Sequence, residues 1–514
     1  MNRIQSSSPQ AWTRRLAVPY LGVVAALQWI DPVVSSMVLL KAANSLQMKG
    51  AMLPLAASIS TLAMAATVLA TGFLADRLGR RRVLIASLWL VVFSNVLCSF
   101  ALSPGLFLFG RVLTGIGLGA FSAASFAYVK VVVEPGELAA SLGVWNLFRT
   151  IFVVFGALQG GLLADISWRL AMLLVPLLGS LCAVLAPFLL PPMRANTKLL
   201  VDIPGLLSIA LAMVLFLFGV SHVVDGFSDT LFLLPTLIGL ALFAFHYWLE
   251  CSHASPIFPV SLYARGFFAA AIVSGIAWNF AYAVVQLQTS NFWQVVQGFS
   301  PASVSAGHLP LLLCFGVGGV VAGRLLKPGQ SLIWLIASGF VFLVIGLLSM
   351  SGVQPSTSYM AFVPALVLVG LGMAFVTVPQ STLFVVEAPD DFYGSVTAFR
   401  TTISQLGFGL GLAASGAFVK EFGLHSLSQH RADLGWDFLQ VPFIATEKVR
   451  AFLEQGEIMR GSNQARQVEL LRRAYASGFW ETMVAAAVVT LVLGCITLWL
   501  LRRGQQQITS ESNP

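Results

Sequence analysis

Charged residues are scarce in this chain. Only 10% of its 514 residues are Asp, Glu, Lys or Arg, whereas 57% are hydrophobic, and the mean hydropathy is +0.86. Soluble domains contain about a quarter charged residues, so this composition excludes an ordinary soluble enzyme or binding domain. Apolar runs recur along nearly the whole chain at close to the roughly 20 residues that cross a bilayer. The sequence therefore predicts an all-α polytopic membrane protein.

Cysteine is also rare, and its five copies lie within or at the ends of apolar runs, where no secreted disulfide framework is built. We interpret them as packing residues. The sequence contains no Walker loop, no cluster of metal ligands and no nucleophile motif. We therefore expect no enzyme activity, no cofactor and no metal site, and an ion gradient is the simplest energy source.

Fourteen apolar segments are long enough to be transmembrane helices. Their expected ranges are 17–40, 51–71, 83–103, 105–129, 141–163, 170–190, 203–223, 231–249, 268–290, 304–325, 331–350, 359–383, 395–419 and 480–501. Most connections are short, so consecutive helices are expected to be antiparallel neighbours. The segment 420–478 is long and charged, and it is either a partly helical flap over the external mouth or a solvated loop.

Basic residues concentrate at the N-terminus and in alternate loops. They are Arg3, Arg14, Arg15, Arg77, Arg80, Arg81, Arg82, Arg194, Lys198, Lys327, Arg502 and Arg503. Because Lys and Arg in short loops stay cytoplasmic, we expect both termini in the cytoplasm. The expected location is the cell inner or plasma membrane. The net charge of +8 is then a topology signal, and nucleic acid is not an expected partner.

An internal repeat indicates two related bundles. The chain reads VWNLFRTIFVVFG around Arg149 and VTAFRTTISQLGFG around Arg400, each with a glycine seven residues after the arginine. Both copies begin a span that follows an acidic turn. Repeated bundles of this kind are a common construction of membrane transporters.

Three motifs resemble signatures of the major facilitator superfamily, in particular its fourteen-span drug:proton antiporter branch (EmrB/QacA-type). GFLADRLGRRR at 72–82 resembles the loop signature between the second and third helices, and RVLTGIGLGA at 111–120 resembles the fourth-helix signature. FGALQGG at 155–161 resembles the antiporter signature GPxxGG, with Ala157 in place of proline. The matching antiporter residues are Gly156, Gly160 and Gly161.

This resemblance implies a specific architecture. An N-terminal six-helix bundle would occupy residues 1–192, and two inserted helices with their linkers would occupy 193–266. A C-terminal six-helix bundle would occupy 267–514, including the external loop 420–478. The resemblance also implies alternating access by rocking of the two bundles.

Asp31 and Arg111 are the candidate proton-coupling residues. An ionisable side chain within hydrocarbon is costly and is a functional candidate by default. Asp31 is the only acid deep in any predicted span, and its neighbour Pro32 removes a backbone hydrogen bond. Arg111 would be its electrostatic partner, and the resemblance implies a role in proton handling for this arginine. The alternatives are a permanent structural ion pair for Asp31 and interhelical hydrogen bonding for Arg111.

The loop motif is interpreted as a cytoplasmic gate formed by Gly72, Asp76, Arg77, Gly79 and Arg80. Glycines at 72 and 79 permit the turn, and Asp76 is suited to cap an opposing helix N-terminus. The arginines would pair with acids such as Glu134 or Glu387. The alternative is an anchor that only sets the topology.

Polar and aromatic residues on one face of the ninth span predict a substrate cavity. They are Asn279, Tyr282, Gln286, Thr289 and Trp293, at three- and four-residue spacing. Interhelical packing is the alternative. Arg149 and Arg400 are also cavity candidates, although snorkelling or pairing between bundles is favoured for both. His308 is a candidate for titration near neutrality, with a neutral hydrogen-bonded histidine as the favoured alternative.

The predicted function is proton-coupled export of amphipathic small molecules, with substrate, protons and the lipid bilayer as partners. The tenth span has no acid, which favours neutral, monocationic or anionic substrates over multivalent cations. The alternative is a dedicated metabolite or siderophore exporter of the same fold, and Ala157 leaves uncoupled transport open. A receptor or scaffold would not need Asp31, Arg111 and the gate motif together. The sequence does not indicate whether a periplasmic adaptor takes part.

Overall fold

The computed structural model describes residues 11–48, 52–192, 202–252, 260–326, 332–388, 393–429 and 462–511. All regular elements in these ranges are helical. The α-helices are α1 (Ala11–Leu46), α2 (Met52–Leu78), α3 (Arg80–Ser99), α4 (Pro104–Val132), α5 (Leu138–Ile166), α6 (Trp168–Met172), α7 (Leu174–Leu189), α8 (Ile203–Ser221), α9 (Thr230–Ser252), α10 (Gly266–Asn291), α11 (Pro301–Gly307), α12 (Leu309–Leu325), α13 (Leu332–Leu348), α14 (Tyr359–Glu387), α15 (Tyr393–Gln429) and α18 (Ser462–Glu511). Short helical turns include η1 (Pro135–Glu137), η3 (Val260–Ala264) and the π-helical turn η4 (Phe292–Val296).

The predicted spans are present. Within the described residues, 13 helical segments are long and apolar enough to cross a membrane, and the shorter apolar helix Leu332–Leu348 occupies the place of the eleventh predicted span. Two predicted spans each consist of two consecutive helices, α6 with α7 and α11 with α12. The predicted all-α polytopic fold is thus confirmed.

Several predicted ends were wrong because helices continue beyond the hydrocarbon length. The second span was expected to end at residue 71, yet α2 continues to Leu78. The thirteenth was expected to end at residue 419, yet α15 continues to Gln429. The last was expected to begin at residue 480, yet α18 begins at Ser462. Residues 420–429 and 462–478 of the predicted loop are therefore helical, and its remainder lies outside the described residues.

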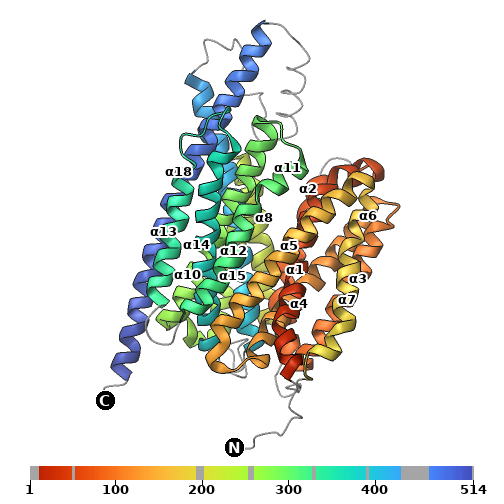
Figure 1. The fold of residues 1–514 in the computed structure, drawn as a ribbon, viewed down its shortest axis with the longest axis vertical. Helices are drawn as coiled ribbons and strands as arrows, with labels where there is room; N and C mark the ends of the chain where they lie inside the picture. Colours follow the sequence, from red (N-terminus) through yellow and green to blue (C-terminus); the bar gives the residue numbers. More distant parts are fainter. Residues whose placement is uncertain are drawn as a thin grey trace, which may run out of the picture.

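The helices pack in two groups (Figure 1). Helices α1–α7, the N-terminal half, pack mainly against one another, as do α10–α18, the C-terminal half. Helix α8 packs on α9 and also contacts α2 and α15, one helix from each half. Helix α1 begins and α18 ends at the same end of the molecule, which we call the terminal end.

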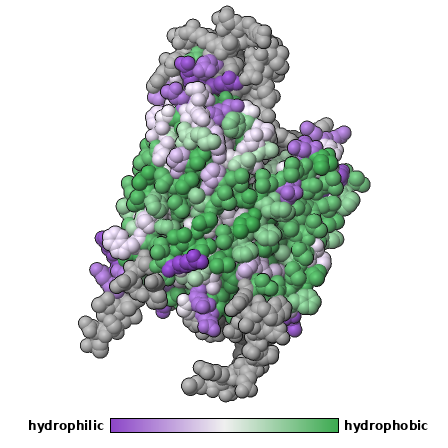
Figure 2. Space-filling model, viewed as in Figure 1, coloured by the Kyte–Doolittle hydropathy of each residue, from purple (hydrophilic) through white to green (hydrophobic). Residues whose placement is uncertain are grey.

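The surface agrees with a membrane position. Figure 2 shows hydrophobic side chains forming a broad band across the middle, with hydrophilic side chains gathered toward the two ends. Exposed large apolar residues on the outer helices contribute to this hydrophobic surface, among them Phe93, Leu177, Phe188, Trp248 and Trp334. Exposed apolar surface on this scale is unfavourable in water and suits a lipid environment.

The halves meet closely at the terminal end along α5 and α12. A Cβ added at Gly143 would lie 2.5 Å from the carbonyl oxygen of Gly319, and one at Gly323 would clash with the carbonyl oxygen of Ala139. Side chains at these glycines would therefore force the two backbones apart. Small residues at such helix contacts permit close packing in membranes.

Candidate functional site: a buried ion pair beside a central cavity

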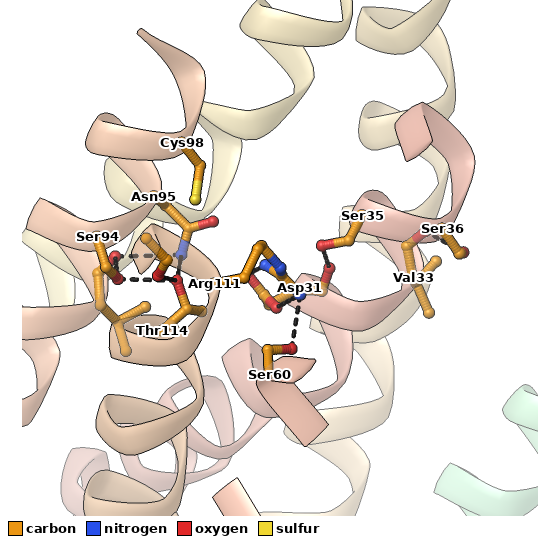
Figure 3. Close-up of polar contacts among 12 residues, drawn as sticks. Asp31, Val33, Ser35, Ser36, Ser60, Ser94, Asn95, Cys98, Arg111 and Thr114 are labelled. Atoms are coloured by element: carbon orange, nitrogen blue, oxygen red, sulfur yellow. Dashed lines mark hydrogen bonds and ion pairs between the residues drawn. The ribbon is translucent and has the colours of Figure 1, made fainter. Parts of the chain in front are cut away.

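Asp31 on α1 and Arg111 on α4 form a buried ion pair (Figure 3). Arg111 Nη1 lies 3.0 Å from Asp31 Oδ1, and Nη2 lies 3.0 Å from Oδ2. Each residue is 1% exposed. Arg111 Nη2 also donates to Ser60 Oγ on α2 at 2.7 Å. The predicted partners are therefore together, and one guanidinium connects three helices.

Small residues allow the helices to converge around this pair. A Cβ on Gly115 of α4 would clash with the carbonyl oxygen of Ser60, so α2 and α4 approach closely beside Arg111. Gly156 and Gly160 of α5 lie against α1, where an added Cβ would be 2.6 Å from Ile30 Cγ1 or from Val34 Cγ2. The third glycine of the motif, Gly161, faces only Met37 Sδ at 4.0 Å. Two of the three motif glycines thus allow α1 to lie close to α5 beside Asp31.

A cavity of about 130 Å³ lies between the halves, next to the ion pair. Its lining includes Ser60, which accepts the Arg111 hydrogen bond, and Pro32, which follows Asp31. The further lining residues are Ala25, Gln28, Trp29, Val33, Thr61, Met64, Leu118, Ser122, Phe126, Trp145, Arg149, Trp278, Asn279, Gln286, Arg400, Thr401, Ser404, Gln405 and Phe408. Both halves contribute residues to the cavity wall.

The structure brings four of the predicted cavity residues to this space, namely Asn279, Gln286, Arg149 and Arg400. Tyr282 lies behind the wall and packs on Trp29 and Phe408, with ring centroids 5.7 and 5.9 Å away. The middle part of the predicted face of the ninth span therefore lines this cavity.

The outer part of the same face does not line this cavity. Trp293 is fully buried in the π-helical turn η4 and packs against His308 and Phe362, with ring centroids 5.0 and 5.5 Å away. Thr289 Oγ1 lies 2.8 Å from His308 Nε2, and His308 Nδ1 lies 2.9 Å from the Val304 carbonyl oxygen. These residues form a packed plug within the C-terminal half and do not line the cavity.

Arg149 and Arg400 lie inside the protein and do not snorkel. They are 5% and 6% exposed. The Arg149 guanidinium lies 5.1 Å from the ring centroid of Phe315 in the opposite half, and that of Arg400 lies 4.3 Å from Phe126 in the opposite half. The contact between halves that the sequence favoured is therefore present as cation–π packing.

The loop motif contacts both halves at the terminal end. Asp76 Oδ1 accepts a hydrogen bond from Arg80 Nε at 2.9 Å and lies 2.8 Å from Arg80 Nη2 in an ion pair. Asp76 Oδ2 accepts a hydrogen bond from the backbone N–H of Ser395 at 3.2 Å. Ser395 lies in the first turn of α15, so the predicted capping of an opposing helix is present. Arg77 is half-buried near the end of α2.

Two details of the motif differ from expectation. Gly79 adopts a positive φ of 99° and makes the turn alone, whereas Gly72 is buried inside α2. Glu387 pairs with Arg265 at 3.3 Å, not with an arginine of the loop. Helix α2 continues through Gly72 because Phe73, Ala75 and Asp76, which follow it, are buried against the protein.

Other cavity residues on α1, α2 and α15 were not predicted from the sequence. Arg400, Ser404 and Phe408 recur at four-residue spacing on α15, the same signal that identified the ninth span. The four-residue spacing that begins at the FRT motif of Arg400 predicts this face of α15. Trp29 and Ser60 carry no such signal, since aromatic and small polar residues are common throughout the predicted spans.

A mid-protein cavity between two helical halves, flanked by an intramembrane ion pair, defines a multi-pass membrane transporter of small molecules. The chain belongs to the Major Facilitator Superfamily, whose pattern it matches over residues 21–412. It is similar to the methylenomycin A resistance protein of Bacillus subtilis (strain 168), with 23% identity over 85% of this chain and 93% of the relative. It is also similar to the multidrug resistance protein Stp of Mycobacterium tuberculosis (strain CDC 1551 / Oshkosh), with 25% identity over 72% and 69%.

A solved structure shares the fold. The human organic anion transporter MFSD10 (TETRAN) superposes with a TM-score of 0.61 at 14% identity, covering 95% of this chain and 100% of that one. At this identity the likeness concerns the fold alone. The two relatives are named for resistance to methylenomycin A and to multiple drugs, which agrees with the drug:proton antiporter branch that the motifs resemble.

Proposed function

We propose that this protein is a proton-coupled exporter of amphipathic small molecules that works by alternating access in the cell inner or plasma membrane, with both termini in the cytoplasm. The observation that carries the proposal is the Asp31–Arg111 pair, buried beside a cavity shared by both halves. Relatives named for resistance to methylenomycin A and to multiple drugs support export.

The ion pair offers a physical route for coupling. Protonation of Asp31 neutralises its carboxylate and weakens its hold on Arg111, because the attraction between the opposite charges is lost. Arg111 also binds Ser60 on α2, and Ser60 lines the cavity. A change at Asp31 is therefore transmitted to a helix in contact with the substrate. Protons and substrate would compete through this helix.

The same helix closes the terminal end. Helix α2 carries Ser60 at the cavity and Asp76 at the contact with α15. Loosening of α2 at Arg111 would weaken the Asp76 contact and favour opening toward the cytoplasm. The described conformation is then a state closed on the cytoplasmic side. The moving bodies in this scheme are bundles 1–192 and 267–514, with the inserted segment 193–266 between them.

The test is transport of lipophilic dyes by cells and proteoliposomes containing wild type or Asp31→Asn. Wild type should extrude at least one dye, and a protonophore or Asp31→Asn should abolish the uphill movement. Asp165→Asn is a matched control, because this carboxylate lies on α5 but its side chain is 81% exposed. Uphill export that survives both the protonophore and Asp31→Asn would contradict the coupling.

The second candidate is a dedicated exporter of one metabolite or siderophore, not coupled to protons. Ala157 in place of the antiporter proline favours it, since α5 runs unbroken from Leu138 to Ile166. In that case no dye should move, whereas comparison of culture media should show one compound excreted only by cells with the protein.

A further inference from the structure

Two side-chain amides from opposite halves of the protein point at one sulfur atom in the central cavity. Gln28 on α1 and Gln405 on α15 direct Nε2 to Met64 Sδ on α2, at 3.9 and 4.0 Å. All three side chains line the cavity. Gln28 and Gln405 are half-buried, whereas Met64 is 4% exposed. These residues, which we call the amide–thioether cluster, are therefore part of the surface that a substrate meets.

The sulfur is a weak partner for these two amides. A thioether is a poor hydrogen-bond acceptor, and a good N–H···O bond joins atoms only about 2.7–3.2 Å apart. One sulfur also serves both donors, and neither amide nitrogen has an oxygen acceptor among the described residues. An oxygen that enters beside Met64 would therefore replace two weak contacts with two stronger ones.

The surrounding wall offers another donor and no carboxylate. Trp278 lines the cavity and is fully buried, and its indole Nε1 has no hydrogen-bond partner within the described part of the chain. None of the described lining residues is Asp or Glu. A ligand that accepts hydrogen bonds therefore matches this wall better than one that only donates them.

Aromatic surface lies next to both amides. Trp29 follows Gln28 on α1, and Phe408 lies three residues after Gln405, on the same face of α15. The two rings come from opposite halves and meet edge to face, with centroids 6.4 Å apart. Rings at such distances favour aromatic ligands, so the cavity presents arene-binding surface beside paired amide donors.

We infer that the substrate is an arene that carries a carbonyl group, such as an aromatic ketone, and that its oxygen accepts hydrogen bonds from Gln28 and Gln405 in place of the Met64 sulfur. Because the two amides belong to opposite halves, this oxygen would contact both bundles at once. The inference rests on the proposed export function and narrows its substrate class.

Two probes of nearly the same shape test the carbonyl requirement. They are 2-acetylnaphthalene and 2-isopropenylnaphthalene, in which a CH₂ group replaces the oxygen. Binding is measured by equilibrium dialysis of the full-length protein in nanodiscs, with empty nanodiscs to subtract partitioning. The variants are Gln28→Leu, Gln405→Leu, their combination and Met64→Leu. Gln354→Leu is the matched control, because Gln354 is exposed and does not line the cavity.

Wild type should bind the ketone about fivefold or more tightly than the alkene, as expected for two neutral hydrogen bonds. Each single Gln variant should lower this ratio, and the double variant should bring it close to one. Met64→Leu should keep or raise the ratio, since it removes the competing acceptor, and Gln354→Leu should not change it. A wild-type ratio near one, an unchanged ratio in the double variant, or loss of the ratio in Met64→Leu overturns the inference.

Alkene binding monitors the fold of every variant. If a Leu variant loses both probes, the corresponding Gln→Met variant decides, because methionine keeps the unbranched shape and lacks the donor. A lowered ratio there supports the inference, and an unchanged ratio overturns it. Infrared difference spectra of the ketone labelled with ¹³C at the carbonyl give an independent readout. The carbonyl stretch should fall in wavenumber on binding to wild type and fall less in the Gln variants; no shift on binding overturns the inference.

Proteoliposome transport separates this inference from the proposed function. Proton-driven uphill movement of lipophilic dyes without any preference for the ketone over the alkene leaves proton-coupled export intact and overturns the carbonyl class. Uphill movement of the ketone in preference to the alkene supports both. A ketone that binds with the expected ratio but never moves uphill under a proton gradient supports the amide–thioether cluster as its site and contradicts proton-coupled export.

Discussion

The Asp76 carboxylate at the end of α2 accepts a hydrogen bond from the backbone N–H of Ser395 at 3.2 Å, joining the two halves of the protein at the terminal end. Asp76 is 8% exposed and is held in place by Arg80. A carboxylate at a helix N-terminus is favoured by the unpaired N–H groups and the helix dipole. This contact therefore contributes to closing that end.

Asp76→Ala should shift the protein toward opening at the terminal end. A hydrogen bond to a charged group contributes about 1.5–3 kcal/mol, enough to change the population ratio by roughly tenfold or more. Spin labels at the exposed positions Glu137 and Arg324, near the ends of α5 and α12, report the separation of the halves in a cysteine-free background. The longer distance should gain population.

Two substitutions at Ser395 distinguish loss of the hydrogen bond to Asp76 from a general loss of structure. Ser395→Ala keeps the backbone donor and should leave the distance distribution unchanged. Ser395→Pro removes the N–H in the first turn of α15, where proline is tolerated, and should behave like Asp76→Ala. Equal effects of the alanine and proline variants would argue against the cap.

Gly143→Val should also open the terminal end. Its Cβ would lie 2.5 Å from the carbonyl oxygen of Gly319, so valine forces α5 and α12 apart. The expected result is a larger separation of the same spin labels and slower transport. Gly136→Val is the control, since no atom lies within 4 Å of its added Cβ. Wild-type distances in the Gly143 variant would show that this contact does not limit opening.

Alanine substitutions at the three glycines of the antiporter motif should reduce transport to different extents. Gly156→Ala and Gly160→Ala would press a Cβ against Ile30 and Val34 at 2.6 Å and displace α1 beside Asp31. Overpacking costs about 1–3 kcal/mol, and proton-driven transport should fall in both variants. Gly161→Ala meets only Met37 Sδ at 4.0 Å and should transport normally. The measurement is the initial rate of dye uptake into inverted vesicles at fixed pH gradient.

A uniform loss of transport across all three glycine variants would indicate that the motif acts as a whole. An unaffected Gly156→Ala would mean that α1 adjusts without moving Asp31.

Arg111→Gln should destabilise the protein more than the double variant Asp31→Asn with Arg111→Gln. Removing one partner of a buried pair leaves an uncompensated charge and costs about 3–5 kcal/mol, whereas removing both charges costs less. Wild type, Asp31→Asn, Arg111→Gln and the double variant form a double-mutant cycle. Comparing their thermal unfolding in one detergent measures the interaction energy between the two side chains. Additive losses in the cycle would show that the two residues do not stabilise each other.

The sequence by itself determined the membrane class, the approximate positions of the spans and the turn at Gly79. These follow from local physics, because hydrocarbon thickness fixes the length of an apolar run and glycine readily adopts a positive φ. Asp31 and Arg111 were also identifiable individually, since ionisable groups are rare within apolar spans.

Only the tertiary structure decided which residues meet. Asp31 and Arg111 are paired at 3.0 Å although they lie on α1 and α4, and Arg149 and Arg400 line one cavity although each belongs to a different half. Trp293 follows the same spacing as Asn279 but is buried in a packed plug. Helical periodicity gives the direction of a side chain relative to its own helix. It does not determine which neighbouring helix covers that face, because this depends on packing between segments far apart in the chain.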